Sequence, residues 1–516
     1  MDGSVANLES ARQSVPREEN GGAQFRTLSL RWRTIVRLAA TLTSLALASC
    51  SMTPPYERPS SELPGKWIET LQQESMTPGE RWWTLYRDPV LDRLVEEALA
   101  MNRDLAVAAA RVEEARALLR ITDAERSPTI DATVGVDRTR SSERSSLPLP
   151  PGTPLRRDTY DARINVAYEL DLWGRLRGAS DAARAQLLAT HAARETVRIT
   201  LATQVVQSYF SLVAFDEQIE VTRRTLELRG QNLDLQRHRY KAGLITDFNL
   251  RQLEAEVAAA RAQLPQLEQR RTSVDVALGV LLGRSPRAIV EETLRVAREN
   301  DALAQAVVPE GLPSDLLLRR PDIVQAEQLL IAANAQIGVA RAALFPRIAL
   351  TGYLGSESTT LGDLFTAPAR IWQLAFALAQ PIFQGGRLRA EVEAVNARER
   401  QALAQYQKTL QTAFGEVREA LVAQSRTRDT FAAEDERVAA LRETLRLARI
   451  RFDNGLSSQL EVIDAERNLL QAELNRADAL RAQRAAVADV VRTLGGGWRG
   501  LPDASADAGP RQANAN

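Results

Sequence analysis

The sequence predicts a mainly α-helical chain, duplicated internally, in which each half also carries a short β part. Three observations predict this class. Landmark residues recur in the same order in both halves. Long stretches rich in alanine, leucine, glutamate and arginine contain almost no proline, which favours long helices. Between them lie short segments in which apolar and polar residues alternate, as in β-strands.

The composition excludes several classes of protein. The 516 residues include 66 basic and 66 acidic side chains, and this zero net charge argues against a nucleic-acid partner. With two histidines and one cysteine, we expect neither a disulfide framework nor a metal site. A mean hydropathy of −0.26 argues against a membrane protein built from many spanning helices.

The amino terminus, residues 1–49, is predicted to be an extension followed by an export signal. Arginines precede an apolar run over 38–48 that is too short to span a bilayer as a helix. The run ends in Leu-Ala-Ser-Cys, which matches a bacterial lipobox, and Cys50 is the only cysteine. We expect Cys50 to carry diacylglycerol and a fatty acyl chain at the start of a lipidated segment, 50–80. Ser51 follows it, whereas an aspartate there would suggest retention at the inner membrane. Because such a long extension before a signal is unusual, we expect translation to start downstream of the first methionine.

Four landmarks indicate the duplication. They are Asp104 and Asp322, Pro128 and Pro346, 173–177 and 385–389, and 239–244 and 451–456. The first two pairs are shifted by 218 residues and the last two by 212, and their common order makes chance an unsatisfactory explanation. The expected organisation is a first repeat at 81–292, a linker at 293–312, a second repeat at 313–498 and a disordered tail at 499–516.

Each repeat is predicted to contain two strands with one apolar and one polar face. The four strands are expected at about 129–138, 160–172, 347–355 and 370–380. Segments of this length with alternating character are typical of a transmembrane β-barrel. The alternative is the edge of a soluble sandwich, but each pair leads directly into very long helices instead of further strands. Because four strands cannot close a barrel and open edges cannot lie in lipid, several chains must share one, and three would supply twelve strands.

The long helices are expected at about 176–240, 247–283, 388–452 and 458–494. In the first of them, one apolar row repeats every seven residues, and a second row lies nearly opposite it. The two rows are Val205, Leu212, Ile219, Leu226, Leu233 and Tyr240, and Val221, Leu228 and Leu235. Two apolar seams suit a helix in the wall of a closed helical barrel, where it packs against a neighbouring helix on each side. The alternative is a buried helix in a large bundle. Pro265 is expected to kink the following helix.

The stretch 311–340 carries a family resemblance. It contains Gly-Leu-Pro-Ser-Asp-Leu-Leu-Leu-Arg-Arg-Pro-Asp-Ile and then Ala-Ala-Asn-Ala-Gln-Ile-Gly-Val-Ala, and Phe345-Pro346 continues it. This resembles the signature of outer-membrane efflux proteins, TolC-like channels of the lipoprotein subfamily that serves RND-type pumps, over about 80–498. The resemblance implies a homotrimer with a twelve-stranded outer-membrane β-barrel, a twelve-helix periplasmic α-barrel and an equatorial belt around 284–312.

The resemblance also implies a gate at the helix tips far from the membrane. The acidic motif of the family corresponds to Leu460, Glu461 and Asp464, where threefold symmetry would place six carboxylates in a narrow pore that favours cations. Without the resemblance, an ordinary solvated helix face is the preferred interpretation of these residues. Where the prototype has a tyrosine and an arginine that latch the closed state, this chain has Phe452 and Ser457. The contacts that hold the closed state are therefore expected to differ from those of the prototype.

Two tight turns resemble the family's docking surface for a periplasmic adaptor. They comprise Ala242, Gly243 and Leu244, and Asn454, Gly455 and Leu456. Each glycine also has a plain role, since a turn that ends a helix needs positive φ. The partners implied are this adaptor, an inner-membrane RND-type pump and outer-membrane lipid.

The predicted function is passive conduction of drugs or other small toxic solutes, without enzymatic activity and with no cofactor beyond the lipid on Cys50. A type I secretion channel is an alternative within the family. A periplasmic coiled-coil adaptor lipoprotein is another, although adaptors have one central hairpin instead of two full repeats. An enzyme is disfavoured because His191 and His238 lie among arginines in a helix without a recognisable catalytic arrangement.

Overall fold

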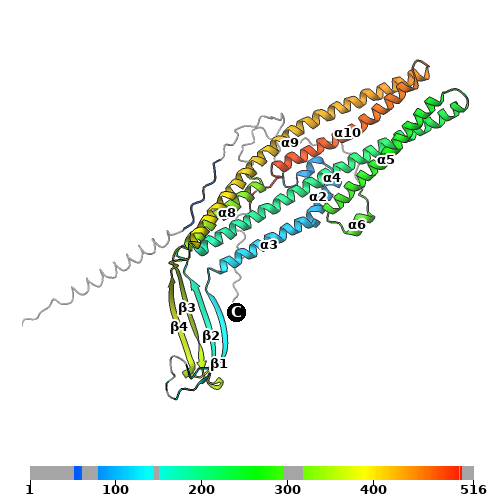
Figure 1. Cartoon of the computed structure of the whole chain (residues 1–516). Helices are drawn as coiled ribbons and strands as arrows, with labels where there is room; N and C mark the ends of the chain where they lie inside the picture. Colours follow the sequence, from blue (N-terminus) through cyan, green and yellow to red (C-terminus); the bar gives the residue numbers. More distant parts are fainter. Residues whose placement is uncertain are drawn as a thin grey trace, which may run out of the picture.

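The computed structural model describes residues 52–60, 79–144, 150, 152–294, 318–498 and 500–501. Cys50, the signal, most of the predicted linker and nearly all of the tail lie outside these residues. Figure 1 shows a sheet at one end of an elongated molecule and a long bundle of helices leading away from it.

The first repeat contains the elements up to α6, and the second begins at α8. The first has η1 (Trp82–Tyr86), α2 (Pro89–Met101), α3 (Arg103–Ala124), β1 (Thr129–Arg140), β2 (Arg156–Glu169), α4 (Arg175–Lys241), α5 (Asp247–Leu281) and α6 (Pro286–Glu291). The second has α8 (Pro321–Ala342), β3 (Arg347–Ser358), η2 (Leu361–Asp363), η3 (Ala367–Ala369), β4 (Arg370–Ala379), α9 (Arg387–Asp453) and α10 (Gln459–Thr493).

The duplication is present in the lengths of the elements. The helices α4 and α9 have 67 residues each, α5 and α10 have 35 each, and α3 and α8 have 22 each. The change of shift from 218 to 212 arises on the sheet side, where 34 residues separate β1 from α4 and 28 separate β3 from α9. The two repeats therefore differ by six residues in their strand hairpins and not in their helices.

The four strands form one antiparallel sheet in the order β1-β2-β3-β4. Within the described chain, β1 and β4 each leave one edge unpaired. The second strand begins earlier than the sequence predicted and ends at Glu169, because polar residues such as Arg157 and Asp158 pair with the end of β1. The ion pair between Arg138 and Asp158, at 2.7 Å, supports this extension.

One face of the sheet is apolar and exposed. The pairing places Ile130 opposite Val166, Ile164 opposite Leu354, and Leu354 opposite Trp372. Exposed apolar side chains come from all four strands, namely Ile130, Val134, Val136, Ile164, Val166, Leu350, Leu354, Trp372, Leu374, Phe376 and Leu378. This is the alternation that the sequence predicted, and such a face is suited to lipid.

The main apolar core lies midway along the helices, away from the sheet. It joins η1 and α2 to the middle of α4 and the ends of α5 and α10. Its largest side chains include Trp82, Trp83, Tyr86, Tyr209 and Phe210. Two contacts of Tyr86 hold η1 there. Its ring lies 4.8 Å from that of Phe210 between centroids, and its hydroxyl donates a hydrogen bond to the Arg484 carbonyl oxygen at 2.7 Å.

The two heptad rows of α4 have different surroundings. In the first row Val205, Leu212 and Leu233 are buried within the chain. In the second row, Leu228 and Leu235 are 49% and 53% exposed. The described chain therefore covers one seam along α4 and leaves part of the other open.

Two further findings concern the helices. Pro265 lies inside α5, which continues through it as one helix, and the expected kink stays a prediction. None of the helices in the described ranges combines the length and the apolar composition that crossing a bilayer would require.

Candidate functional site

Two helix hairpins end side by side at the far end from the sheet (Figure 1), and their turns have the same geometry. Gly243 and Gly455 adopt φ of +72° and +68°. The Leu244 amide donates to the Arg239 carbonyl oxygen at 2.9 Å, and the Leu456 amide donates to that of Arg451 at 2.8 Å. Each hairpin is thus closed by a glycine in the left-handed region and a bond that spans five residues.

The residues predicted for docking are all exposed at these two tips. The set is Ala242, Gly243 and Leu244 in the first, and Asn454, Gly455 and Leu456 in the second. The two leucines are 72% and 70% exposed, which leaves an apolar side chain uncovered at each tip. The docking role itself stays a prediction.

The predicted gate residues on α10 are exposed, and each acid has an arginine nearby. Arg451 Nε lies 3.8 Å from Glu461 Oε2, and Arg467 Nη1 lies 3.9 Å from Asp464 Oδ1. Leu460 is 49% exposed beside them. The acids therefore form a partly balanced strip on one hairpin, and a closed ring needs further chains.

Phe452 and Ser457 are placed inside the second hairpin. Phe452 is half-buried against an apolar cluster that includes Val462 and Leu445, so it joins α9 to α10. The Ser457 hydroxyl is buried without a hydrogen-bond partner. The equivalent residue of the first hairpin, Ile245, packs in an apolar cluster there.

A charge cluster above the tips was missed by the sequence analysis. Arg229 of α4 is 7% exposed and donates to Glu256 of α5 at 3.2 Å. Its Nε lies 3.8 Å from Glu466 of α10, and Arg467 lies 3.5 Å from Glu256. Arg449 of α9 donates to Glu466 at 2.8 Å. The cluster connects all four long helices and couples one hairpin to the other.

The second face of the sheet is polar. Arg163 pairs with Asp161 at 3.3 Å and Glu357 at 2.8 Å, and its guanidinium lies 5.1 Å from the centre of the Tyr353 ring. Asn165 donates to Thr133 at 3.1 Å on the same face. With lipid on the apolar face, these groups would line an aqueous interior.

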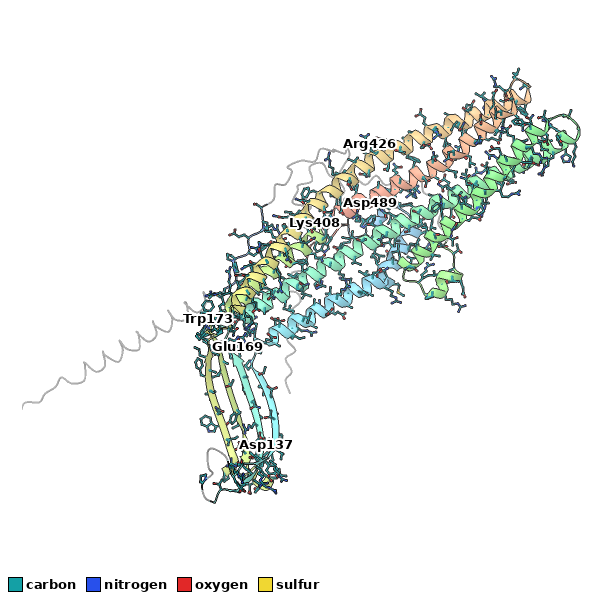
Figure 2. All side chains as sticks on the ribbon, viewed as in Figure 1. Asp137, Glu169, Trp173, Lys408, Arg426 and Asp489 are labelled. Atoms are coloured by element: carbon teal, nitrogen blue, oxygen red, sulfur yellow. The ribbon has the colours of Figure 1, made fainter. Side chains whose placement is uncertain are left out.

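The junction between sheet and helices is aromatic. Figure 2 shows Glu169 and Trp173 at this junction and Asp137 towards the opposite end of the sheet. Trp173 stacks on Phe345 with 4.9 Å between centroids and donates to the Pro346 carbonyl oxygen at 2.8 Å. Glu169 pairs with Arg175 at 2.9 Å, which joins the end of β2 to the start of α4.

Two results bear on other chemistry. Within the described ranges, no group of three or more histidine, cysteine or acidic side chains could hold a metal ion. His238 is exposed on α4, with Nδ1 2.7 Å from the Asp234 carbonyl oxygen, as expected for a solvated helix residue.

Comparison with known proteins identifies the family. A model of the outer membrane efflux protein family matches residues 94–284 and, a second time, residues 312–496. The chain belongs to this family. The two matches confirm the internal duplication, and the resemblance inferred from the sequence is correct.

Relatives in the family cover nearly the whole chain. The chain is 36% identical over 462 residues to the solvent efflux pump outer membrane protein SrpC of Pseudomonas putida, covering 88% of this chain and 97% of SrpC. It is 33% identical over 470 residues to the probable outer membrane lipoprotein SilC of Salmonella typhimurium, covering 90% and 99%. The outer membrane location is shared by these relatives and is that of this chain.

Solved channels have the same fold. The Campylobacter jejuni CmeC outer membrane channel superposes with a TM-score of 0.84 at 26% identity, covering 89% of this chain and 97% of CmeC. The open state of the Neisseria gonorrhoeae MtrE outer membrane channel gives 0.76 at 30% identity, covering 87% and 98%. The chain therefore has the TolC-like fold, and its family comprises transport proteins.

Proposed function

We propose that three copies of this chain form the exit duct of a tripartite efflux system, which passively conducts drugs or other small toxic solutes out of the cell. An inner-membrane RND-type pump would supply the energy and a periplasmic adaptor would join pump to duct. Cys50 would carry the lipid anchor, as the lipoprotein name of SilC suggests for that relative. The names of the relatives, which include a solvent efflux pump component, support the transport role.

The observation that carries the proposal is the sheet. It has an apolar face, a polar face and two unpaired edges, and it continues into helices of 67 residues. Edges cannot stay open in lipid, so neighbouring copies must pair them. At 1.5 Å per residue each long helix extends roughly 100 Å, enough to carry the passage far from the membrane.

The gate is proposed at the tip of the second hairpin. Three copies would bring Glu461 and Asp464 together around the axis, with Leu460 as an apolar constriction. Because Arg451 and Arg467 lie near these acids, we expect only a moderate preference for cations. The charge cluster around Arg229 would hold the hairpins together in the closed state, in place of a tyrosine–arginine latch. The exposed Leu244 and Leu456 would meet the adaptor.

Single-channel conductance in planar bilayers tests the proposal. The Glu461→Ala/Asp464→Ala variant is expected to conduct more than wild type and to lose its cation preference, because the constriction loses six carboxylates. The matched control is Asn249→Ala/Gln252→Ala, which alters the equivalent positions of the first hairpin. This control should leave conductance and selectivity unchanged.

Two outcomes would contradict different parts of the proposal. Equal conductance and equal ion selectivity in wild type and acid variant would remove the gate assignment. Failure to insert into bilayers, together with a monomeric mass in detergent, would remove the duct itself.

A further inference from the structure

A short segment near the amino terminus, residues 52–60, lies along α8 and is here termed the strap. In Figure 1 it is the dark blue trace beside α8. Asn334 of α8 donates from its side-chain amide to the Pro54 carbonyl oxygen at 2.9 Å. Tyr56 packs against a core cluster that includes Ile323 of α8 and Tyr406 of α9. The strap therefore occupies a defined path on two helices of the second repeat.

Glu327 is the main polar contact of the strap. Arg58 donates to both carboxylate oxygens of Glu327, at 2.6 and 2.7 Å, and the Tyr56 hydroxyl donates to one of them at 3.3 Å. The Glu327 side chain is 8% exposed, whereas that of Arg58 is 53% exposed. A nearly buried carboxylate on the helix thus holds two side chains of the strap, and a bidentate arginine fixes position as well as adding energy.

The strap is also held by close packing at its other end. A Cβ added at Gly338 of α8 would overlap the Thr53 hydroxyl and lie 2.8 Å from Thr53 Cα. A Cβ added at Gly178 of α4 would lie 3.5 Å from the same hydroxyl. Gly338 therefore leaves the space that Thr53 occupies, since a larger residue there would displace this end of the strap.

The two contacts define a direction and a spacing. From Arg58 to Thr53 the strap advances five residues, while its partners on α8 advance eleven, from Glu327 to Gly338. Five extended residues span roughly 17 Å, and eleven helical residues rise roughly 17 Å. The strap is therefore extended between its two contacts, and it runs towards the end of α8 that leads into β3.

That end of α8 lies at the membrane side of the molecule. Phe345, stacked on Trp173, follows the helix, and the exposed apolar face of the sheet begins just beyond it with Leu350 and Leu378. Aromatic residues at the boundary of an apolar band are typical of the bilayer surface. From Thr53, three residues reach back to Cys50 and span at most about 10 Å, similar to the rise from Gly338 to Phe345.

We propose that the strap is a ruler, with Glu327 as its positioning residue, that sets the distance between the lipid-bearing amino terminus and the body of the duct. Because Glu327 holds Arg58 and Tyr56, the lipid anchor is restrained close to the level of the Trp173–Phe345 pair. The lipid then resists movement of the barrel along the bilayer normal. A lipid attached through a flexible segment would not do so. This inference rests on the lipid attachment proposed above.

The first test measures release of the strap in the full-length protein purified with its lipid. Chymotrypsin can cleave after Tyr56 only when the strap leaves α8. Glu327→Ala is expected to raise the cleavage rate about tenfold, since it removes a bidentate charged hydrogen bond. Glu327→Gln keeps the size and an acceptor, and should give an intermediate rate. The control Glu443→Ala removes an exposed carboxylate that is paired to Arg446 within α9, and should cleave like wild type.

The second test measures position, which a merely stabilising contact would not control. Cys50 is the only cysteine, so in the lipidated protein Met52→Cys supplies one free thiol for a fluorescent probe. In vesicles with spin-labelled lipids, we expect headgroup labels to quench this probe strongly. Adding Glu327→Ala should reduce that quenching several-fold, while adding Glu443→Ala should not change it.

Each failure has a distinct meaning. Equal cleavage and equal quenching in the Glu327→Ala and control backgrounds would overturn the ruler. A probe that headgroup labels never quench would overturn it too, because the strap would then not reach the bilayer surface. A mature mass without lipid, or two labelled thiols, would overturn the anchor part of the proposed function, and the ruler with it.

Discussion

The two long hairpins have the same length and the same turn, but they differ in what surrounds them. The helix α4 packs against α2, α3, α5, α8 and α10, whereas the main partners of α9 are α8 and α10. Accordingly α4 has more than twice as many buried residues as α9. Duplication therefore preserved geometry while environment diverged: α4 is largely enclosed by the rest of the chain, whereas α9 leaves more of its side chains exposed.

The two tips also differ, and the first has the more favourable local contacts. In the first, Ile245 packs in an apolar cluster and the Thr246 hydroxyl accepts a hydrogen bond from the Asn249 amide at 3.3 Å. In the second, the Ser457 hydroxyl is buried without a partner and Ser458 makes no side-chain cap bond. The tip that carries the proposed gate residues is thus the less stabilised one, which agrees with the proposal that this tip moves when the channel opens.

The first predicted difference between the repeats concerns the glycines that end α5 and α10. Gly283 and Gly495 both have positive φ, so alanine costs about 1 kcal/mol at either position. At Gly283 the new Cβ would also clash with the Met101 carbonyl oxygen, whereas at Gly495 it would lie 3.7 Å or more from its neighbours. We expect Gly283→Ala to lose about 2 kcal/mol more stability than Gly495→Ala.

Thermal unfolding of both variants, followed by circular dichroism, checks this ranking. Equal losses would show that the approach of Met101 to α5 is not the tight contact that the structure describes.

The second prediction concerns a substitution that removes the central arginine of the charge cluster between the hairpins. Arg229→Ala leaves the carboxylates of Glu256 and Glu466, both largely buried, with less compensation. We expect a loss of up to about 3 kcal/mol from the closed arrangement, because a buried charge loses its partner. The measurable result is a conductance above that of wild type.

Arg446→Ala is the matched control, since Arg446 pairs with Glu443 on the exposed surface of α9 and both side chains are in water. Its conductance should equal that of wild type. An Arg229→Ala channel that also conducts like wild type would contradict the latch role of the charge cluster.

The smallest predicted difference concerns the helix caps. Thr246→Ala removes a real cap bond and should destabilise the first tip by about 1 kcal/mol. Ser458→Ala removes no such bond, and the second tip should change by less than about 0.5 kcal/mol. Amide hydrogen exchange at the two turns measures both effects, and equal acceleration at the two turns would contradict the difference between them.

The elements that could be predicted from sequence are those with a period. Alternation in the strands indicated which residues share the exposed apolar face. The absence of proline indicated the length of α4, and the heptad spacing indicated its two seams. The start of β2 was missed because Arg156 to Thr159 carry no apolar alternation, and only their pairing with β1 makes them strand.

The site was predictable only in part, for a related reason. The turns at Gly243 and Gly455 have a local signature, so their place was evident. Arg229 and Glu466 are 237 residues apart, and Arg58 and Glu327 are 269 apart. No local sequence pattern predicts which arginine will be buried against which carboxylate, since burial depends on how the helices pack.

The unpaired edges of the four-stranded sheet have a genetic consequence. If three copies close one barrel, a chain with a damaged β1 edge does not fail alone, because it removes a seam from every assembly that it joins. With equal amounts of damaged and normal chain, only about one trimer in eight would contain normal copies alone. Mutations at these edges should therefore behave as dominant, while mutations that stop export of the chain should be recessive.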